Sequence, residues 1–498
     1  MQEDHRRATL RCWQVQPSDL VAEAAGQAIG ACRIAGDRWG LIEDGIGQWC
    51  RDQLQGQPAC GDEAEPEQDA TTPAAHVGSL IIERVGQTAL ARWRLPVGRG
   101  AAVDRMPVMD GPLAYNSNLH PAEDLAAIAD QVARFGGAVR QRLGWPRLGV
   151  DLRLGSRALA EAASQGVAGL RRACDGAGLQ IDTLNLFPLQ PFQNERVKEQ
   201  VYRPDWSEDD RLQPTLTGIE VALALSDADL VTISTLPGSF KPWRPGTRQV
   251  AAMAARLGRW AAAAARAEAA TGRRVVLCLE PEPWCLLERS HEVVAFWDGP
   301  VQEHAVPACV AALDDDHAAA QRAVARHIGW CADTCHISVA FEEQSVAIER
   351  LQACGAGVMK MQVSACPEVT DAADAGQVAA LRRLDEPRFL HQTALRQADG
   401  VVRQVVDLDR LDALLVTAEA GDTVRSHFHI PLDREPADGL HSTRFDSLAG
   451  LAAAGAGGCR HVAVETYTWS ILADDDGDRI AGTAGELAWL AERQPRPG

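Results

Sequence analysis

The sequence predicts an α/β fold in which eight strands alternate with helices and close into a (β/α)8 barrel. Two observations lead to this prediction. From residue 111 onward, short apolar runs of strand length alternate with longer segments whose apolar residues have helical spacing. Residues that can bind a metal follow several of those runs, and barrels of this kind place their active sites at the carboxyl ends of their strands. These residues are Glu280, Asp333, His336, Gln362, His427 and Glu465.

The elements are expected in a regular order along the chain. Strands are expected at residues 112–118, 147–153, 179–187, 230–235, 274–280, 328–333, 357–364 and 461–466. Helices are expected between them at 122–143, 156–177, 212–228, 247–271, 339–354 and 444–456. Parallel strands need long crossover connections of this type. A doubly wound open sheet is the rival fold, but it gathers its site at one switch point, whereas the polar residues here follow many different strands.

Composition excludes some classes of partner. The chain has 498 residues, a formal net charge of -19 and a pI near 5.2. No nucleic acid partner is expected, because phosphate contacts require clustered Lys and Arg. The 13 cysteines include no CxxC pair and no signal-like start is present, which predicts reduced thiols and a cytoplasmic protein. The apolar stretch 251–271 contains Arg256, Arg259, Arg266 and Glu268, so no direct membrane insertion is expected.

The first part of the chain gives no functional signal. Residues 1–105 are interpreted as an N-terminal extension, disordered or arising from a start assigned too far upstream, and residues 106–498 as the barrel domain. Within the extension, 19–54 has the spacing of two short helices, 55–78 reads as a linker, and 79–98 is compatible with a small hairpin.

Several longer motifs resemble one family. The pair Asp333 and His336 resembles a motif of the xylose-isomerase-like barrels, which include sugar epimerases and endonuclease IV. The strings NSNLHP (116–121), NLFPLQPF (185–192), RVKEQVYRPDW (196–206), STLPGSFK (234–241), KMQVS (360–364), FLHQ (389–392), HFHIPL (427–432) and VETYTW (464–469) together resemble the EboE family, over about residues 112–490. Members of that family are described as metabolite traffic proteins encoded in Ebo clusters.

The resemblance implies a site that holds one divalent metal ion. In related epimerases the positions matching Glu280 and Glu465 bind the metal and move a proton, so both are expected to be ligands and acid/base groups. Asp333 is expected as a third ligand, and His336 as a catalytic group that contacts substrate or metal. Gln362 stands where related epimerases have His, and it suits Mn or Mg better than Zn.

Two histidines and several other residues complete the expected site. His427 is expected to compensate for Gln362 as a metal ligand, and His429, which alternation places on the same face, to contact substrate. The metal is expected to be Mn, Mg or Zn. His120, Asn185 and Lys241 are further candidates for substrate binding, although His120 also fits a helix cap and Lys241 a solvated surface charge. The loop with Lys198, Tyr202 and Trp206 is a candidate lid.

Two main function classes remain open from the sequence. The retained carboxylates favour a metal-dependent isomerase or epimerase acting on a sugar or cyclitol-like metabolite, in the production or export of a secondary metabolite. The replaced third ligand favours a non-catalytic protein that binds and carries a metabolite, with other Ebo cluster proteins as possible partners. A metal-dependent phosphoesterase of the endonuclease IV type fits less well, because Gln193 stands where a further His ligand is expected.

Overall fold

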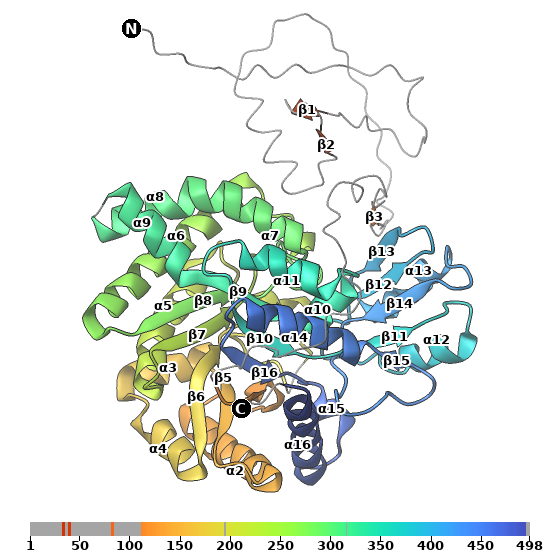
Figure 1. Cartoon of the computed structure of the whole chain (residues 1–498), viewed down its shortest axis with the longest axis horizontal. Helices are drawn as coiled ribbons and strands as arrows, with labels where there is room; N and C mark the ends of the chain where they lie inside the picture. The colour runs from red at the N-terminus through yellow and green to blue at the C-terminus, as the bar shows by residue number, and fades with distance from the viewer. Residues whose placement is uncertain are drawn as a thin grey trace, which may run out of the picture. The chain divides into compact units, whose positions relative to one another are not determined.

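The computed structural model describes residues 111–193, 196–314 and 316–494, together with three short strands before them (Figure 1). The chain divides into two compact units, Met1–Gln68 and Asp69–Gly498. In the first unit β1 (Cys32–Ile34) pairs antiparallel with β2 (Arg38–Gly40), where the sequence predicts helix. The tripeptide between them, Ala-Gly-Asp, has turn-forming composition. Apart from the short strand Ile81–Glu83, the rest of the predicted extension lies outside the described residues, and its boundary at 105 stays a prediction.

Eight parallel strands form a closed barrel, as the sequence predicts. In barrel order they are β4 (Ala114–Asn116), β5 (Leu148–Arg153), β6 (Leu179–Asn185), β7 (Leu230–Thr235), β8 (Arg274–Leu279), β9 (Ile328–Asp333), β10 (Val358–Val363) and β16 (His461–Val464), which returns to β4. Their residues are buried on both faces, which explains why these strands read as continuous apolar runs.

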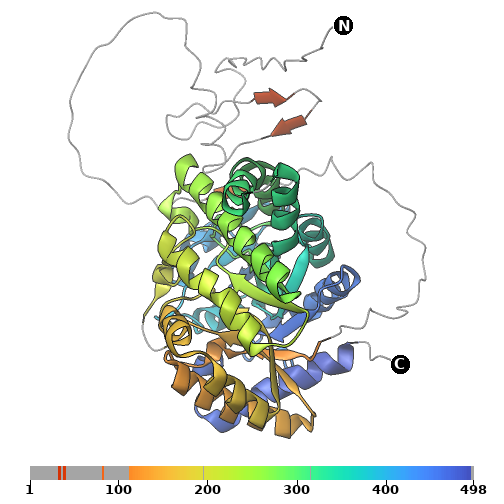
Figure 2. The same cartoon turned by 90° about the vertical axis from the view of Figure 1, so that its left-hand side faces the viewer.

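Helices connect successive strands and cover the outside of the barrel (Figures 1 and 2). They are α2 (Leu125–Leu143), α3 (Ser156–Gln165), α4 (Ala168–Ala177), α5 (Asp209–Leu225), α6 (Thr247–Thr271), α10 (Thr334–Val339), α11 (Gln344–Gln352), α14 (Asp446–Ala456), α15 (Trp469–Leu472) and α16 (Asp476–Arg493). The predicted helix 156–177 is two helices, because Gly166 between them has a φ of 75°, which ends α3. Short 3-10 turns are η3 (Ser117–Leu119), η4 (Lys198–Tyr202), η5 (Lys241–Trp243), η7 (Leu408–Arg410) and η8 (Thr443–Phe445).

Between β8 and β9 the chain forms a helical segment that the sequence analysis does not predict. It comprises α7 (Ser290–Phe296), the π-helix η6 (Trp297–Ala305), α8 (Val306–Leu313) and α9 (His317–His327). The π-helix contains Pro300 and packs against α6. Gly258 on α6 permits this approach, because a Cβ there would lie 2.0 Å from the carbonyl oxygen of Ala305.

A second, antiparallel sheet is inserted between β10 and β16. Its strands, in order, are β15 (His441–Ser442), β11 (Pro367–Val369), β14 (Thr423–Ser426), β12 (Thr393–Arg396), β13 (Val402–Val405) and β3 (Ile81–Glu83). Helices α12 (Ala375–Arg382) and α13 (Leu411–Leu415) pack on it around a separate apolar core. Of the hairpin expected in 79–98, the described part is β3, which pairs with β13. In Figure 1 this sheet lies beside α10 and α14.

The inserted sheet is joined to the barrel near the ends of the strands. Ala365, just after β10, forms an isolated bridge with Ile430, just after β14. The segment 427–430 therefore runs along the rim of the barrel. Among the described helices, none combines the length and apolar character that crossing a bilayer requires.

Candidate active site and metal centre

A pocket of about 570 Å³ opens at the carboxyl ends of the barrel strands. The barrel contributes polar groups to it, η4 contributes Lys198, Val201 and Tyr202, and the inserted segment contributes Phe389, Leu390, His427 and His429. The remaining lining residues are Asn118, Asn185, Phe187, Pro188, Phe192, Val197, Glu280, Glu282, His336, Glu465 and Tyr467. A pocket with mostly apolar walls and a few convergent polar groups is typical of a small-molecule site.

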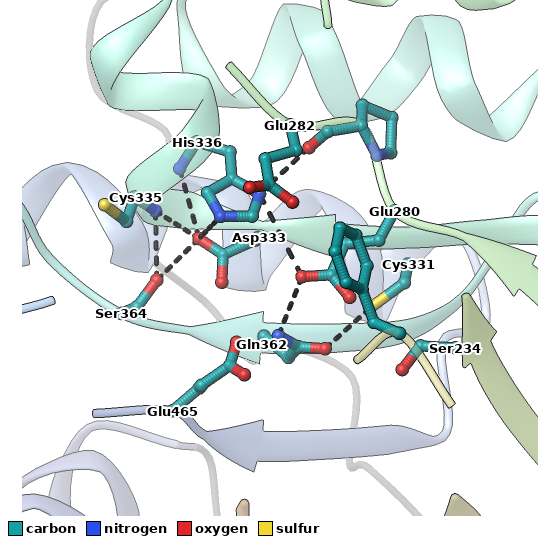
Figure 3. A network of polar contacts seen from close by, with 12 residues as sticks. Ser234, Glu280, Glu282, Cys331, Asp333, Cys335, His336, Gln362, Ser364 and Glu465 are labelled. Carbon is teal, nitrogen blue, oxygen red and sulfur yellow. Dashed lines mark hydrogen bonds and ion pairs between the residues drawn. The ribbon is translucent and has the colours of Figure 1, made fainter. Parts of the chain in front are cut away.

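Three carboxylates, of which Glu280 and Glu465 line the pocket, lie close together (Figure 3). Glu280 follows the last residue of β8, Asp333 ends β9, and Glu465 follows the last residue of β16. One oxygen atom from each lies within 4.8 Å of the others, and all three side chains are buried. The sequence predicts this convergence, because carboxyl ends of parallel barrel strands lie on one face.

Asp333 is held by the start of the next helix. Its Oδ1 accepts hydrogen bonds from the backbone N–H groups of Cys335 and His336, at 2.8 and 3.1 Å, and so caps α10. The hydroxyl of Ser364 donates to the same oxygen at 2.7 Å. Burial opposes the charge, but His336, His429 and these hydrogen bonds lower the pKa of Asp333 below its ordinary value. Asp333 is therefore ionised at neutral pH.

Glu465 is held by two amides of the first strand–helix turn. The Nδ2 groups of Asn116 and Asn118 donate to its Oε1 at 3.0 and 2.7 Å. Asn116 also donates to Asp151 at 2.9 Å. Asp151 forms a fully buried ion pair of 2.8 Å with Lys360, which points into the barrel from β10. A chain of polar contacts thus connects Glu465 to the centre of the barrel.

Burial and mutual repulsion raise the pKa values of the other carboxyl groups. The pKa of Glu280 rises to about 8, through burial and then the charge of Asp333. The pKa of Glu465 rises well above its ordinary value, through burial and the charges of Glu280 and Asp333. Glu282, whose Oε1 accepts a hydrogen bond of 2.8 Å from the hydroxyl of Tyr202, is raised well above its ordinary pKa, by burial first. Groups perturbed in this way are typical of functional sites.

These carboxylates fit a divalent cation. Oε2 of Glu280 and Oδ2 of Asp333 are buried and have no hydrogen-bond partner among the described residues. The nearby lysines already have partners, Lys360 in Asp151 and Lys198 in Asp407. A buried carboxyl group is protonated, paired or bound to a metal. An oxygen-rich set of this kind suits Mg²⁺ or Mn²⁺.

Gln362 lies in the predicted place but presents its amide nitrogen to the site. Its Nε2 donates to Glu280 Oε1 at 2.9 Å, while its Oε1 accepts from the Cys331 thiol at 3.1 Å (Figure 3). In this orientation it positions Glu280, and its metal-ligand role stays a prediction.

Three histidines lie beside the carboxylates. His336 is in the first turn of α10, and His427 and His429 follow β14 in the inserted segment. The ring centroids of His336 and His427 are 4.6 Å apart, and those of His427 and His429 are 5.3 Å apart. Burial lowers the pKa of His427 well below its ordinary value and that of His429 to about 4, so both are neutral. Both line the pocket, in agreement with the alternation predicted for HFH.

The other candidate substrate residues are divided between the pocket and its surroundings. Asn185 lines the pocket, and its Nδ2 has no hydrogen-bond partner in the described part of the chain. His120 instead packs on Phe135, with a centroid distance of 4.7 Å, and burial lowers its pKa to about 3. Lys241 forms ion pairs of 2.6 and 2.7 Å with Glu288 and Glu292. The structure therefore does not place His120 or Lys241 among the pocket residues.

The sequence analysis missed residues that connect the barrel to the inserted segment. Oε1 of Gln392 lies 2.7 Å from Nδ1 of His427, and Nε2 of Gln392 donates to the hydroxyl of Tyr202. The same hydroxyl donates to Glu282. Glu282 was detectable in principle, because it is the second carboxylate of a Glu-Pro-Glu run at a strand end. Gln392 follows no strand of the barrel pattern. Tyr467 directly follows the strand expected at 461–466, but a phenol is not a usual metal ligand, so its position there predicts no metal-binding role.

Comparisons with solved structures found several proteins of low sequence identity to this chain. A probable 3-DHS dehydratase, AsbF, from Bacillus anthracis is 8% identical over 76% of this chain and 99% of its own, with a TM-score of 0.38. A xylose isomerase-like TIM barrel protein from Mycobacterium smegmatis, solved with magnesium, is 11% identical over 77% of this chain and 98% of its own, with a TM-score of 0.41. A D-allulose 3-epimerase from Methylomonas sp., solved with D-allulose, is 12% identical over 57% of this chain and 85% of its own, with a TM-score of 0.31.

The sequence itself matches no protein-family model and no curated protein, so the EboE resemblance stays a prediction. The closed parallel barrel with helices between its strands is the architecture of a (β/α)8 TIM barrel. Because one fold supports many activities, the function has to be argued from the residues of this pocket.

Proposed function

We propose that this chain is a metal-dependent isomerase or epimerase that acts on a sugar or cyclitol-like metabolite. One observation carries the proposal: the buried carboxylates of Glu280, Asp333 and Glu465 bring oxygen atoms within 4.8 Å of one another, and Glu280 and Glu465 line the pocket. Glu280 and Asp333 each keep one oxygen without a partner in the described structure, as expected of ligands that await a cation.

A divalent ion bound there supplies a positive charge that stabilises negative charge on a substrate oxygen. Glu280, Asp333 and Glu465 would hold it, with Asn116 and Asn118 fixing the orientation of Glu465. Residues that hydrogen-bond to a metal ligand in this way fix its orientation and contribute to metal affinity.

The carboxyl groups also suit proton transfer. Glu280 has a pKa of about 8 before any cation is bound, which is near the pH at which an acid/base group is most effective. Glu282 also lines the pocket, and burial raises its pKa well above its ordinary value. Glu280 and Glu282 are therefore the two groups that we assign to proton transfer. Phe187, Phe192 and Phe389 supply apolar walls around them.

The wider role follows from the motif resemblance alone. As an EboE-like protein, the chain would act in the production or export of a secondary metabolite, together with other proteins of an Ebo cluster. The pocket lining, apolar with a few convergent polar groups, suits a small metabolite of this kind.

Metal content and proton exchange together test the proposal. Elemental mass spectrometry on protein purified without added metal is expected to find metal that the variant Glu280→Gln/Glu465→Gln lacks. Exposed Glu349 on α11 provides the matched control, and Glu349→Gln is expected to retain the metal. In deuterated buffer, NMR on a panel of ketoses and inososes is expected to show metal-dependent exchange at the carbon next to the carbonyl. Bound metal without exchange of any substrate would instead indicate a metabolite carrier.

A further inference from the structure

The three histidines are arranged as a group that faces inward. His336 comes from the barrel, and His427 and His429 come from the inserted segment. Their side chains are only 5%, 6% and 1% exposed. The remaining centroid distance, between His336 and His429, is 5.7 Å. Buried imidazoles at this spacing need partners for both ring nitrogens.

The partners of Nδ1 fix the tautomers of two of these rings. Nδ1 of His336 lies 2.9 Å from the carbonyl oxygen of Pro281, and Nδ1 of His429 lies 2.7 Å from that of Glu465. A carbonyl oxygen only accepts hydrogen bonds, so both Nδ1 atoms carry the proton. Nε2 of each ring therefore bears a lone pair.

The tautomer of His427 follows from the orientation of the Gln392 side chain. Its Nδ1 lies 2.7 Å from Oε1 of Gln392. The amide nitrogen of Gln392 donates to the carbonyl oxygen of Pro283 at 3.1 Å and to the hydroxyl of Tyr202 at 2.7 Å, which fixes the orientation of the amide. Nδ1 of His427 is then the donor, and its Nε2 also bears a lone pair.

The ring nitrogens left without a backbone or amide partner lie close together. Nε2 of His336 and Nε2 of His427 are 3.1 Å apart. Nε2 of His429 is buried without a hydrogen-bond partner among the described residues, and it lies 3.9 Å from Oδ2 of Asp333, which is also unpartnered there. Ligand atoms of Asp333, His336 and His429 all lie within 4.8 Å of one another. A cation held by Asp333, His336 and His429 would give a partner to the two unpartnered atoms, Oδ2 of Asp333 and Nε2 of His429.

We propose that His336, His427 and His429, with Oδ2 of Asp333, form a second metal site that takes Zn²⁺. Three imidazole nitrogens and one carboxylate oxygen are a preferred ligand set for tetrahedral zinc, whereas the neighbouring carboxylates suit a harder ion. This inference rests on the proposed function only through Asp333, whose carboxylate the two sites share. It also gives the Nδ1 contacts a role, because metal-bound histidines donate their other N–H to a carbonyl or a similar acceptor.

Metal counting distinguishes the two sites. Wild-type protein dialysed against zinc and then against metal-free buffer is expected to hold about two equivalents. The variant His427→Ala/His429→Ala is expected to lose the equivalent bound at the histidine site and keep the one at the carboxylate site. Glu280→Gln/Glu465→Gln is expected to lose the carboxylate-site equivalent and keep the one at the histidine site. His441 is an exposed histidine of the same inserted sheet, and His441→Ala is expected to keep both equivalents. Two equivalents retained by the histidine variant would overturn the inference.

Cobalt provides a readout in the wild-type chain that requires no variant to fold. Co²⁺ in a four-coordinate, nitrogen-rich site absorbs visible light far more strongly than Co²⁺ in an oxygen-rich, six-coordinate site. Titration of the metal-free protein is expected to produce an intense visible band that added Zn²⁺ removes. A weak band alone would overturn the second site and leave the carboxylate site standing. An intense band with no metal lost from the carboxylate variant would support the second site and count against the proposed function.

Discussion

Replacing Lys360 by Met tests how the barrel tolerates charge at its centre. Lys360 is completely buried, forms a 2.8 Å ion pair with Asp151, and donates to the Ser234 hydroxyl at 2.7 Å. Removing one partner of a buried pair leaves an uncompensated charge, which typically costs about 3–5 kcal/mol. Lys360→Met forces Asp151 either to stay charged in an apolar setting or to take up a proton.

If Asp151 takes up a proton in the variant, the cost of keeping it protonated sets the loss of folding stability and the way that loss depends on pH. Asp151 has an ordinary pKa of 3.8, which burial already raises in the intact protein. Keeping it protonated in the folded variant costs about 1.4 kcal/mol for each pH unit above that value, hence about 4.4 kcal/mol at pH 7 and about 1.6 kcal/mol at pH 5. A carboxyl group whose folded pKa is raised favours the folded state fully below its unfolded pKa, and that stability is lost as the pH rises. The variant should therefore be most damaged at neutral pH.

Urea unfolding of the metal-free protein at pH 5, 6 and 7 measures this effect. The difference in unfolding free energy between wild type and Lys360→Met is expected to shrink as the pH falls. The variant Lys360→Met/Asp151→Asn removes both charges, so its cost should be the same at each pH and smaller than that of the single variant at pH 7. An equal loss for Lys360→Met at pH 5 and pH 7 would refute the charge argument and leave only a packing defect.

Three further substitutions have clear expectations. Glu282→Gln removes a pocket acid that is not among the proposed ligands, so it should lower the rate of substrate proton exchange by about 100-fold while metal content stays unchanged; lost metal would contradict this role. Gly258→Ala places a methyl group 2.0 Å from the carbonyl oxygen of Ala305, so it should lower thermal stability by about 3 kcal/mol. Gly169→Ala on α4, where the methyl group meets nothing within 4 Å, should raise stability slightly, and calorimetry compares the two.

The barrel and its carboxylates were predictable because both follow from the strands. A parallel strand that is buried on both faces is a continuous apolar run, as in 274–279, and the residue after it lies at the active-site end. Glu280, Asp333 and Glu465 were found in this way. The inserted sheet was not found, because its strands have two to four residues each and alternate too briefly to give a period.

The sequence also did not predict how individual side chains are oriented. Sequence spacing placed Gln362 on the correct face but did not indicate that its amide nitrogen turns toward Glu280 and its oxygen toward Cys331. Lys241 follows a strand end as a ligand-binding residue would, yet Glu288 and Glu292 neutralise it from a neighbouring loop and helix. In both cases the deciding partner is distant in the sequence, so periodicity carries no information about it.

The origin of the ligands explains why the pocket contains two chemically different sets. The barrel strands supply the oxygen atoms of Glu280, Asp333 and Glu465, whereas the inserted segment supplies the nitrogen atoms of His427 and His429. Asp333 and the first turn of α10 lie where the sets meet. A cation bound by nitrogen ligands from both parts would therefore fix the inserted sheet against the barrel and close one wall of the pocket. Zinc binding should then stabilise the fold as well as the site, since ligands that bind only the folded state add to its stability.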